Sequence, residues 1–359
     1  MRIVCLILIS VLLGSVSMAD EASVDQPAKV KSAVVKSADV IVAVGAPGKP
    51  EYESLFRDWA TKWKTLAEQT EVSLTTIGLD GESNSQTDSQ TDSQTDSQTD
   101  SQTDSQTDSE LDDKNDRDRL LALLQQQAQT DDIPLWIIFI GHGTFAEDIA
   151  NFNLRGPDLS AKQLNESIAN INRPIVFVNT TSSSGPFIDR LSGERRVIVT
   201  ATKSGEEENF ARFAGRFSNA IQSLESDIDH DDEVSVLEAF LKASKQVGQD
   251  YVASDQLATE HALIDDNGDA KGTPATMFRG HRVDGESQDG SAIDGLLASQ
   301  ITIFRSDSAA APLSAEKMKR RSELESEHEA LRQRRSELSD AEYDAALLPI
   351  MLEIADLYQ

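Results

Sequence analysis

Short runs of apolar residues alternate along the chain with segments in which apolar residues recur every three or four positions. The runs predict strands of a buried sheet, and the recurring pattern predicts helices. The expected strands lie at residues 39–45, 71–78, 133–140, 174–178 and 196–200. The expected helices lie at about 52–69, 116–129, 160–170, 209–224 and 234–247. This alternation is typical of an α/β fold, a three-layer sandwich in which helices cover both faces of a mostly parallel sheet.

Two of the predicted helices carry an apolar stripe that marks the side expected to be buried. In the helix at 52–69 the stripe consists of Leu55, Phe56, Trp59, Trp63 and Leu66. In the helix at 116–129 it consists of Leu120, Leu121 and Leu124. Both helices are therefore expected to pack on the sheet.

The alternating pattern is interrupted by six tandem copies of Ser-Gln-Thr-Asp at residues 85–108. These repeats contain no apolar residue and carry one negative charge each, so they have nothing to bury in a core. We expect them to form a disordered surface insertion in the domain.

The first residues have the order of a secretory signal peptide. Arg2 precedes an apolar run at 3–13, and a small-residue site follows at Ser17-Met-Ala19. The run is too short to span a membrane as a helix. We expect cleavage after Ala19, a polar linker at 20–37, and a secreted or periplasmic protein without a transmembrane segment after processing.

Cysteine usage and charge exclude two classes of function. The only cysteine, Cys5, lies in the leader, so the mature chain would have no disulfide, thiolate ligand or cysteine nucleophile. The formal net charge of −29 argues against a nucleic-acid partner, because binding to phosphates requires Lys and Arg. The same charge favours cation binding.

Residues 314–359 predict a charged helical hairpin or coiled coil. Leucines recur every seven residues among charged side chains, at Leu324, Leu331 and Leu338. A capping box at Ser339-Asp-Ala-Glu342 then begins a second helix, which Pro349 is expected to kink. Its apolar residues alternate in steps of four and three: Tyr343, Leu347, Ile350, Ile354 and Leu357. Packing on its own domain is favoured over a dimerising coiled coil.

Two predicted strands end in residues that can carry chemistry. The strand at 133–140 runs into Gly141-His142-Gly143, and the strand at 174–178 runs into Asn-Thr-Thr-Ser182-Ser-Ser-Gly185. Open α/β sheets place their sites beyond the carboxyl ends of parallel strands. The histidine and the serine cluster are therefore expected near one another.

This ordered set resembles the legumain and caspase clan of cysteine peptidases, particularly bacterial legumain-like proteins. The resemblance includes the third strand and turn at 197–204, covers roughly residues 39–280, and implies a caspase-like domain at 38–305. In that clan a histidine is the general base and a cysteine attacks the carbonyl carbon. The resemblance implies that His142 is the base and Ser182 the nucleophile position, or Ser183 if the alignment slips by one. Backbone N–H groups near Gly143 would form the oxyanion hole.

Serine at the cysteine position is a departure that affects the expected activity. A histidine readily helps to ionise a thiol, whose pKa is about 8.5, whereas a hydroxyl is a much weaker acid. A serine nucleophile also needs an oriented base and an oxyanion hole. Two alternatives follow: a catalytically inactive relative that keeps relic positions, or a peptidase or amidase with a Ser182–His142 dyad.

Residues 227–238 match the twelve-residue loop of an EF-hand, which surrounds Ca²⁺ with about seven oxygens. The expected ligands are Asp227, Asp229, Asp231, the backbone carbonyl of Glu233, Ser235 and Glu238. Asp232 stands where glycine normally makes the sharp turn. A left-handed conformation there costs a non-glycine residue about 1–2 kcal/mol, which would weaken calcium binding without abolishing it.

A further acidic turn at 265–272 offers Asp265, Asn267 and Asp269 as oxygen ligands but has no acid at position twelve. It is therefore not a second EF-hand, and an Asn-Gly turn accounts for its composition. Neither His230 nor His261 has the spacing to a second nitrogen ligand that a transition metal would need.

The sequence thus favours an exported, calcium-binding and catalytically inactive relative of legumain-like peptidases. It would act as a binding or assembly module, with a protein or peptide partner at the cleft or at the C-terminal hairpin. The alternatives are the serine-dependent peptidase or amidase and a structural protein that works through the hairpin.

Overall fold

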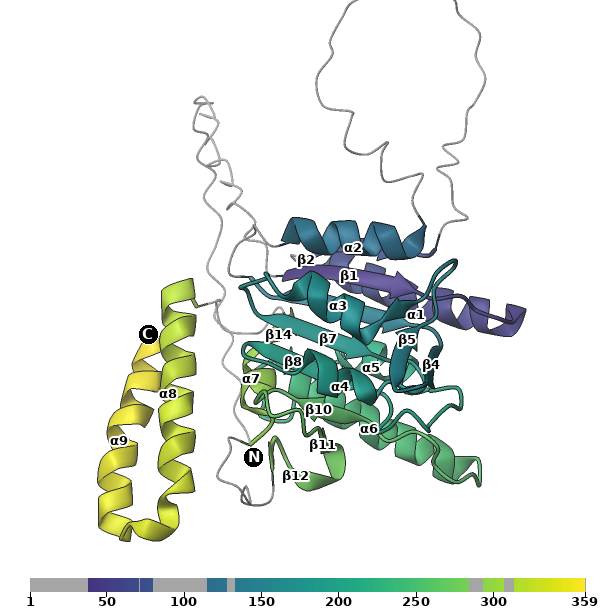
Figure 1. Ribbon diagram of the computed structural model, residues 1–359. Coiled ribbons are helices and arrows are strands. Elements are labelled where there is room, and N and C mark those ends of the chain that lie inside the picture. The colour runs from purple at the N-terminus through teal and green to yellow at the C-terminus, as the bar shows by residue number, and fades with distance from the viewer. Residues whose placement is uncertain are drawn as a thin grey trace, which may run out of the picture. The chain divides into compact units, whose positions relative to one another are not determined.

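The computed structural model describes residues 38–70, 72–79, 115–127, 133–283, 293–306 and 313–358. The predicted leader, linker and Ser-Gln-Thr-Asp insertion lie outside these residues. Within them, seven strands form a central sheet in the order β11-β10-β8-β7-β3-β1-β2 (Figure 1).

Five neighbouring strands of this sheet are parallel, and two at one edge are antiparallel. The parallel strands are β1 (Ala38–Val44), β2 (Val72–Ile77), β3 (Leu135–Ile140), β7 (Ile175–Asn179) and β8 (Arg196–Thr200). The antiparallel strands are β10 (Leu263–Asp265) and β11 (Thr273–Pro274). The mostly parallel sheet expected from the apolar runs is confirmed.

Helices cover both faces of the sheet because each buried strand sends alternate side chains to opposite sides. One apolar cluster joins Val40 and Val42 of β1 to α1 (Pro50–Gln69), α5 (Phe213–Ala220) and α6 (Val236–Ala253). The other joins Ile41 and Ala43 of the same strand to α2 (Asp116–Gln126), α3 (Ala161–Ile168) and α4 (Pro186–Leu191). The predicted three-layer α/β sandwich is therefore present.

The apolar stripes on α1 and α2 were predicted with one error. The residues buried on α1 are Phe56, Ala60, Trp63 and Leu66, and Trp59 is half-buried against the same cluster. Leu55 lies one position before this stripe and is 37% exposed, so its predicted burial is wrong. On α2, Leu120 and Leu124 are buried and Leu121 is half-buried.

Several short elements were not predicted, because strands of two to four residues leave little periodic signal. A small sheet follows the histidine and consists of β4 (Gly143–Ala146), β5 (Ile149–Phe152) and β6 (Leu159–Ser160). Two further pairs are β9 (Glu233–Ser235) with β14 (Thr302–Arg305), and β12 (Phe278–Arg279) with β13 (Arg282–Val283). The short helices are η2 (Leu224–Ser226), η3 (Ala275–Met277), α7 (Leu296–Gln300) and η4 (Arg335–Glu337).

The predicted C-terminal hairpin consists of α8 (Ala315–Gln333) and α9 (Asp340–Leu357), which contact each other (Figure 1). The capping box is confirmed, since Glu342 N–H donates to Ser339 Oγ and Ser339 N–H donates to the Glu342 carboxylate. Helix α9 continues past Pro349. Across the described parts of the chain, we find no helix with both the length and the apolar character needed to cross a membrane.

A buried ion pair ties the sheet together at the amino ends of its strands. Arg173, which precedes β7, donates from Nη1 to the Asp39 carboxylate of β1 over 2.7 Å. The Arg173 side chain is 1% exposed and also donates to the Ile133 carbonyl and to Gln127. This pair lies at the opposite ends of the strands from the candidate catalytic residues.

Candidate functional site

His142 lies at the point where the strand order of the sheet reverses. From β1 the chain goes to β2 on one side, whereas from β3 it goes to β7 on the other. The carboxyl ends of β1 and β3 therefore flank the crevice in which open α/β sheets usually bind ligands. The His142 ring bridges these ends, with Nε2 3.2 Å from the carbonyl of Pro47.

The His142 ring is held in one orientation by aromatic side chains and by this carbonyl. Its centroid lies 4.9 Å from the Tyr52 ring, 5.3 Å from Phe56 and 6.0 Å from Phe210. Burial among these groups lowers the pKa of His142, and the Pro47 carbonyl offsets part of this effect. Because a carbonyl only accepts, Nε2 carries the proton and Nδ1 is the basic nitrogen of the neutral ring.

The Ser182 hydroxyl is bound to the backbone of Gly143. Its Oγ donates to the Gly143 carbonyl over 3.1 Å, and the Gly143 N–H points at the same Oγ from 3.4 Å. Only glycine fits at position 143, because a Cβ there would lie 2.3 Å from the Ser182 carbonyl oxygen. The predicted nucleophile and oxyanion donor are thus adjacent but bonded to each other.

The two following serines are also buried in this turn. Ser183 has a φ of 53°, and its hydroxyl is buried with no hydrogen-bond partner. The Ser184 hydroxyl lies 3.1 Å from Thr202 Oγ1. Among the described residues, no serine of the cluster is hydrogen-bonded to His142. The site has the parts of a dyad without the bond that would make a serine nucleophilic.

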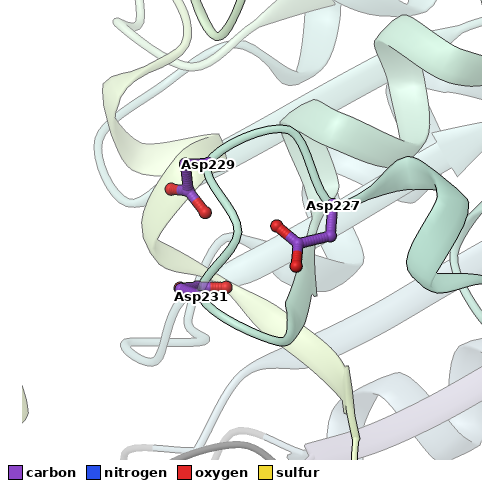
Figure 2. Close-up of side chains that lie close together, drawn as sticks. All are labelled: Asp227, Asp229 and Asp231. Atoms are coloured by element: carbon purple, nitrogen blue, oxygen red, sulfur yellow. The ribbon is translucent and has the colours of Figure 1, made fainter.

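A second candidate site is the loop between η2 and α6. Carboxylate oxygens of Asp227, Asp229 and Asp231 lie within 4.8 Å of one another. The Asp227 side chain faces the other two across the loop (Figure 2). Three converging carboxylates give the oxygen-rich environment that Ca²⁺ prefers.

The backbone of this loop has the sharp turn expected at its sixth position. Asp232 has a φ of 67°, so an aspartate adopts the conformation usually assigned to glycine. Its N–H donates to Asp227 Oδ2 over 3.0 Å, and the His230 N–H donates to Asp227 Oδ1 over 2.6 Å. These bonds orient the Asp227 carboxylate toward the loop interior.

The predicted side-chain ligands at positions nine and twelve have other partners. Glu238 is buried at the start of α6, where its carboxylate accepts from Ser235 N, Ser235 Oγ and the Ile228 N–H. The Glu233 side chain bonds to Thr302 and Arg305, while the prediction concerned its backbone carbonyl. Glu238 would have to exchange its capping bonds for a bound cation.

The carboxylates of this loop destabilise one another when no cation is bound. Burial, followed by the charges of Asp231, Glu238 and Asp227, raises the pKa of Asp229 to about 6. Cation binding would remove this repulsion.

This pKa predicts the pH dependence of the chelator-treated protein. Lowering the pH from 8 to 5 should increase its stability, because native Asp229 takes up a proton near pH 6 and the unfolded chain does so only near pH 4. Asp229→Asn should reduce this slope in urea unfolding curves, and the part due to Asp266 and Asp294, whose pKa values burial raises to about 6 and about 7, should remain. An equal slope in the variant would contradict the assignment.

A cavity of about 330 Å³ separates this loop from helix α8. Asp229 and Asp231 line one side, and Arg321, Glu325 and His328 line the other. Arg321 and Glu325 form an ion pair of 3.1 Å. The hairpin therefore presents charged groups of both signs to the loop.

Comparisons with known proteins concern the fold. No protein-family profile and no curated protein matches the sequence. Among solved structures, the Drosophila initiator caspase Dronc is similar, with 11% identity, 66% of this chain and 81% of the other covered, and a TM-score of 0.39. Caspase-1 from Spodoptera frugiperda has 9% identity, 64% and 86% coverage and a TM-score of 0.38. Raptor from Chaetomium thermophilum has 10% identity, 52% and 17% coverage and a TM-score of 0.30. The likeness is one of fold alone.

Proposed function

We propose that this chain is an exported calcium-binding protein with a caspase-like domain that lacks peptidase activity. The domain would serve as a binding or assembly module whose loop at 227–238 holds the cation. The order of charged, apolar and small residues at the N-terminus supports export.

The observation that carries the proposal is the closed geometry of the loop. Asp227, Asp229 and Asp231 converge without a basic side chain paired to any of them in the described structure. The turn at Asp232 and its bond to Asp227 pre-organise the ligand set, which reduces the ordering cost of binding. Glu238, which is buried at the start of α6, would supply a further carboxylate if it exchanged its capping bonds for the cation.

Calorimetric titration of the mature protein with calcium tests this function. Glu238→Gln should weaken binding by at least about tenfold, because it removes one of the charged ligands. Glu166→Gln is the matched control, since that exposed carboxylate lies on α3 and should leave affinity unchanged. Absence of calcium binding, or equal affinity in the Glu238 variant, would refute the proposal.

The inactive assignment rests on the bonding of Ser182 and His142. The Ser182 proton is directed to the Gly143 carbonyl, and the His142 ring bonds to Pro47. Neither group is arranged to transfer a proton to the other. We expect the protein to hydrolyse short peptide substrates no faster than its His142→Ala variant.

The serine-dependent peptidase remains the second candidate function. It is favoured by the 3.4 Å approach of the Gly143 N–H to Ser182 Oγ, which puts an oxyanion donor beside a hydroxyl. Hydrolysis by the unmodified protein that both His142→Ala and Ser182→Ala abolish would establish this function and exclude the first.

The Ser182→Cys variant tests whether the site around His142 can still support hydrolysis when a thiol replaces the hydroxyl. A thiol ionises far more readily than a hydroxyl beside a histidine. If the cleft lacks only its nucleophile, weak hydrolysis should appear in this variant and vanish in Ser182→Cys with His142→Ala. Persistent inactivity would indicate that the substrate pocket is also missing.

A further inference from the structure

Helix α9 of the C-terminal hairpin has apolar residues on two opposite sides, and none of its residues is fully buried. The helix that it contacts is α8, and α8 in turn bonds to the domain through Ser322 Oγ, which donates to Gln300 over 2.7 Å. One apolar stripe of α9 is half-buried and consists of Tyr343, Leu347, Ile350, Ile354 and Leu357. A helix with apolar residues all round is normally covered on every side.

The other apolar stripe of α9 is exposed and has the spacing of a second coiled-coil seam. Its residues follow one another in alternating steps of four and three: Ala341, Ala345, Leu348, Leu352 and Ala355. All five are exposed, Leu348 by 59% and Leu352 by 57%. The segment 345–352 contains no charged residue. Steps of four and three keep side chains on one face of a helix, where they pack against a partner helix.

The exposed stripe is almost symmetric about Leu348, so it complements a second copy of itself. Ala341 and Ala355 lie seven positions to either side of Leu348. In an antiparallel pair centred on Leu348, Ala341 would therefore face Ala355 of the other copy. Ala345 would face Leu352 in the same way, and a small residue opposite a large one lets two helices interdigitate. A surface that complements itself is what a twofold dimer requires.

The charges of the hairpin also favour the antiparallel direction. The first half of α9 carries no Lys or Arg, and its acids are Asp340, Glu342 and Asp344. The second half lies beside the basic start of α8, where Arg320 binds the Glu353 carboxylate and Lys317 binds the carbonyl of Leu357. An antiparallel pair brings the acidic half of each α9 to this basic end of the other hairpin, whereas a parallel pair would place the acidic halves together.

We propose that α9 pairs with α9 of a second copy of this chain, antiparallel and centred on Leu348. The two hairpins would then form a four-helix arrangement. This pairing names a partner for the assembly role of the proposed function, and it requires neither calcium nor the cleft at His142. Each copy contributes one helix of 18 residues, which is a small interface, so we expect a Kd on the order of 10 μM.

Sedimentation equilibrium of residues 20–359 at about 1–300 μM, a range that brackets this Kd, tests the proposal. Leu348→Glu should weaken association by at least about a hundredfold, because it sets two carboxylates against each other at the centre of the pair. Leu348 is largely exposed in the single chain, so the variant should keep the circular dichroism spectrum of the unmodified protein.

Leu257→Glu is the matched control. Leu257 is 90% exposed and lies outside the hairpin, and the substitution adds the same charge. Association should remain as in the unmodified protein. Equal losses in the two variants would indicate an effect of net charge and would contradict a seam at α9.

Disulfide crosslinking determines the direction of the pair. Residues 20–359 contain no cysteine, because the only one is Cys5, so an introduced thiol has no competitor. Ala341→Cys and Ala355→Cys should crosslink when the two variants are mixed, since an antiparallel pair brings these positions together. Each variant alone should crosslink little. A parallel pair would give the reverse result.

The outcomes are distinct from those for calcium binding when both are measured on the same samples. A dimer that Leu348→Glu removes, with crosslinks in the mixture, supports the pairing whether or not calcium binds. A monomer at about 300 μM, which is about thirty times the expected Kd, overturns it. Association that Leu348→Glu leaves unchanged, or crosslinks in the single variants in place of the mixture, also overturns it. Absence of calcium binding refutes the proposed calcium site alone.

Discussion

Calcium at about 100 times its Kd should raise the free energy of unfolding of this protein by about 2.7 kcal/mol. The expected gain follows from mass action, because the folded loop gathers Asp227, Asp229 and Asp231 and the unfolded chain does not. Urea unfolding curves in calcium and in chelator measure the difference directly. Removal of the cation by chelator should reverse it.

Glu238→Gln should remove most of this stabilisation while leaving the chelator-treated protein folded. A glutamine at the third helical position can still close the capping box with Ser235. The variant therefore separates the ligand role of this side chain from its capping role. Equal unfolding curves with calcium and with chelator in the unmodified protein would reduce the loop to an acidic turn.

The largest loss of stability is expected from Asp39→Ala, at about 3–5 kcal/mol. The substitution leaves the buried Arg173 guanidinium without its carboxylate, and its side chain is only 1% exposed. Calcium affinity should be unchanged, because the ion pair lies at the amino ends of the strands. Denaturant unfolding and calcium titration of the same protein give both quantities.

Two controls accompany this variant. Glu166→Ala breaks the exposed pair with Lys162 and should cost at most about 1 kcal/mol. Arg173→Met in the Asp39→Ala protein removes the unpaired charge and should restore part of the lost stability. A loss in Asp39→Ala no greater than that in Glu166→Ala would show that the guanidinium is adequately satisfied by Ile133 and Gln127.

The sequence was sufficient for the sheet and its covering helices because the central strands are buried on both faces. The run Leu135–Ile140 has no polar residue and was predicted as a strand, although the predicted range began two residues earlier, at Ile133. The antiparallel edge and the small sheet after His142 consist of strands too short to show a period. Their positions depend on tertiary pairing, as with Leu263 opposite Thr200.

The sequence predicted which residues of the candidate sites lie close together, but it did not predict the hydrogen bonds between them. Parallel neighbours β3 and β7 necessarily bring His142 and Ser182 to the same edge of the sheet. The partner of the histidine is the Pro47 carbonyl, 95 residues earlier in the chain, and no local pattern reveals it.

The sequence did contain a signal for the second role of Glu238. Ser235-Val-Leu-Glu238 is a capping box as well as positions nine to twelve of a calcium loop. The two motifs share the same residues, so both roles had to be weighed together. In the structure the Glu238 carboxylate caps helix α6. It would have to leave this cap to act as a ligand of a bound cation.

The pairing of β9 with β14 has a consequence for the order in which the protein can fold. Strand β9 forms part of the calcium loop, yet its hydrogen-bonding partner begins at Thr302, far later in the chain. A nascent chain that has not reached this residue has all the predicted ligands of the loop but not the strand that fixes its geometry. Contacts between such distant segments form late, because the intervening chain must first be ordered. During synthesis, calcium would therefore bind tightly only after the rest of the domain has assembled, so the cation would stabilise a finished fold and would not nucleate it.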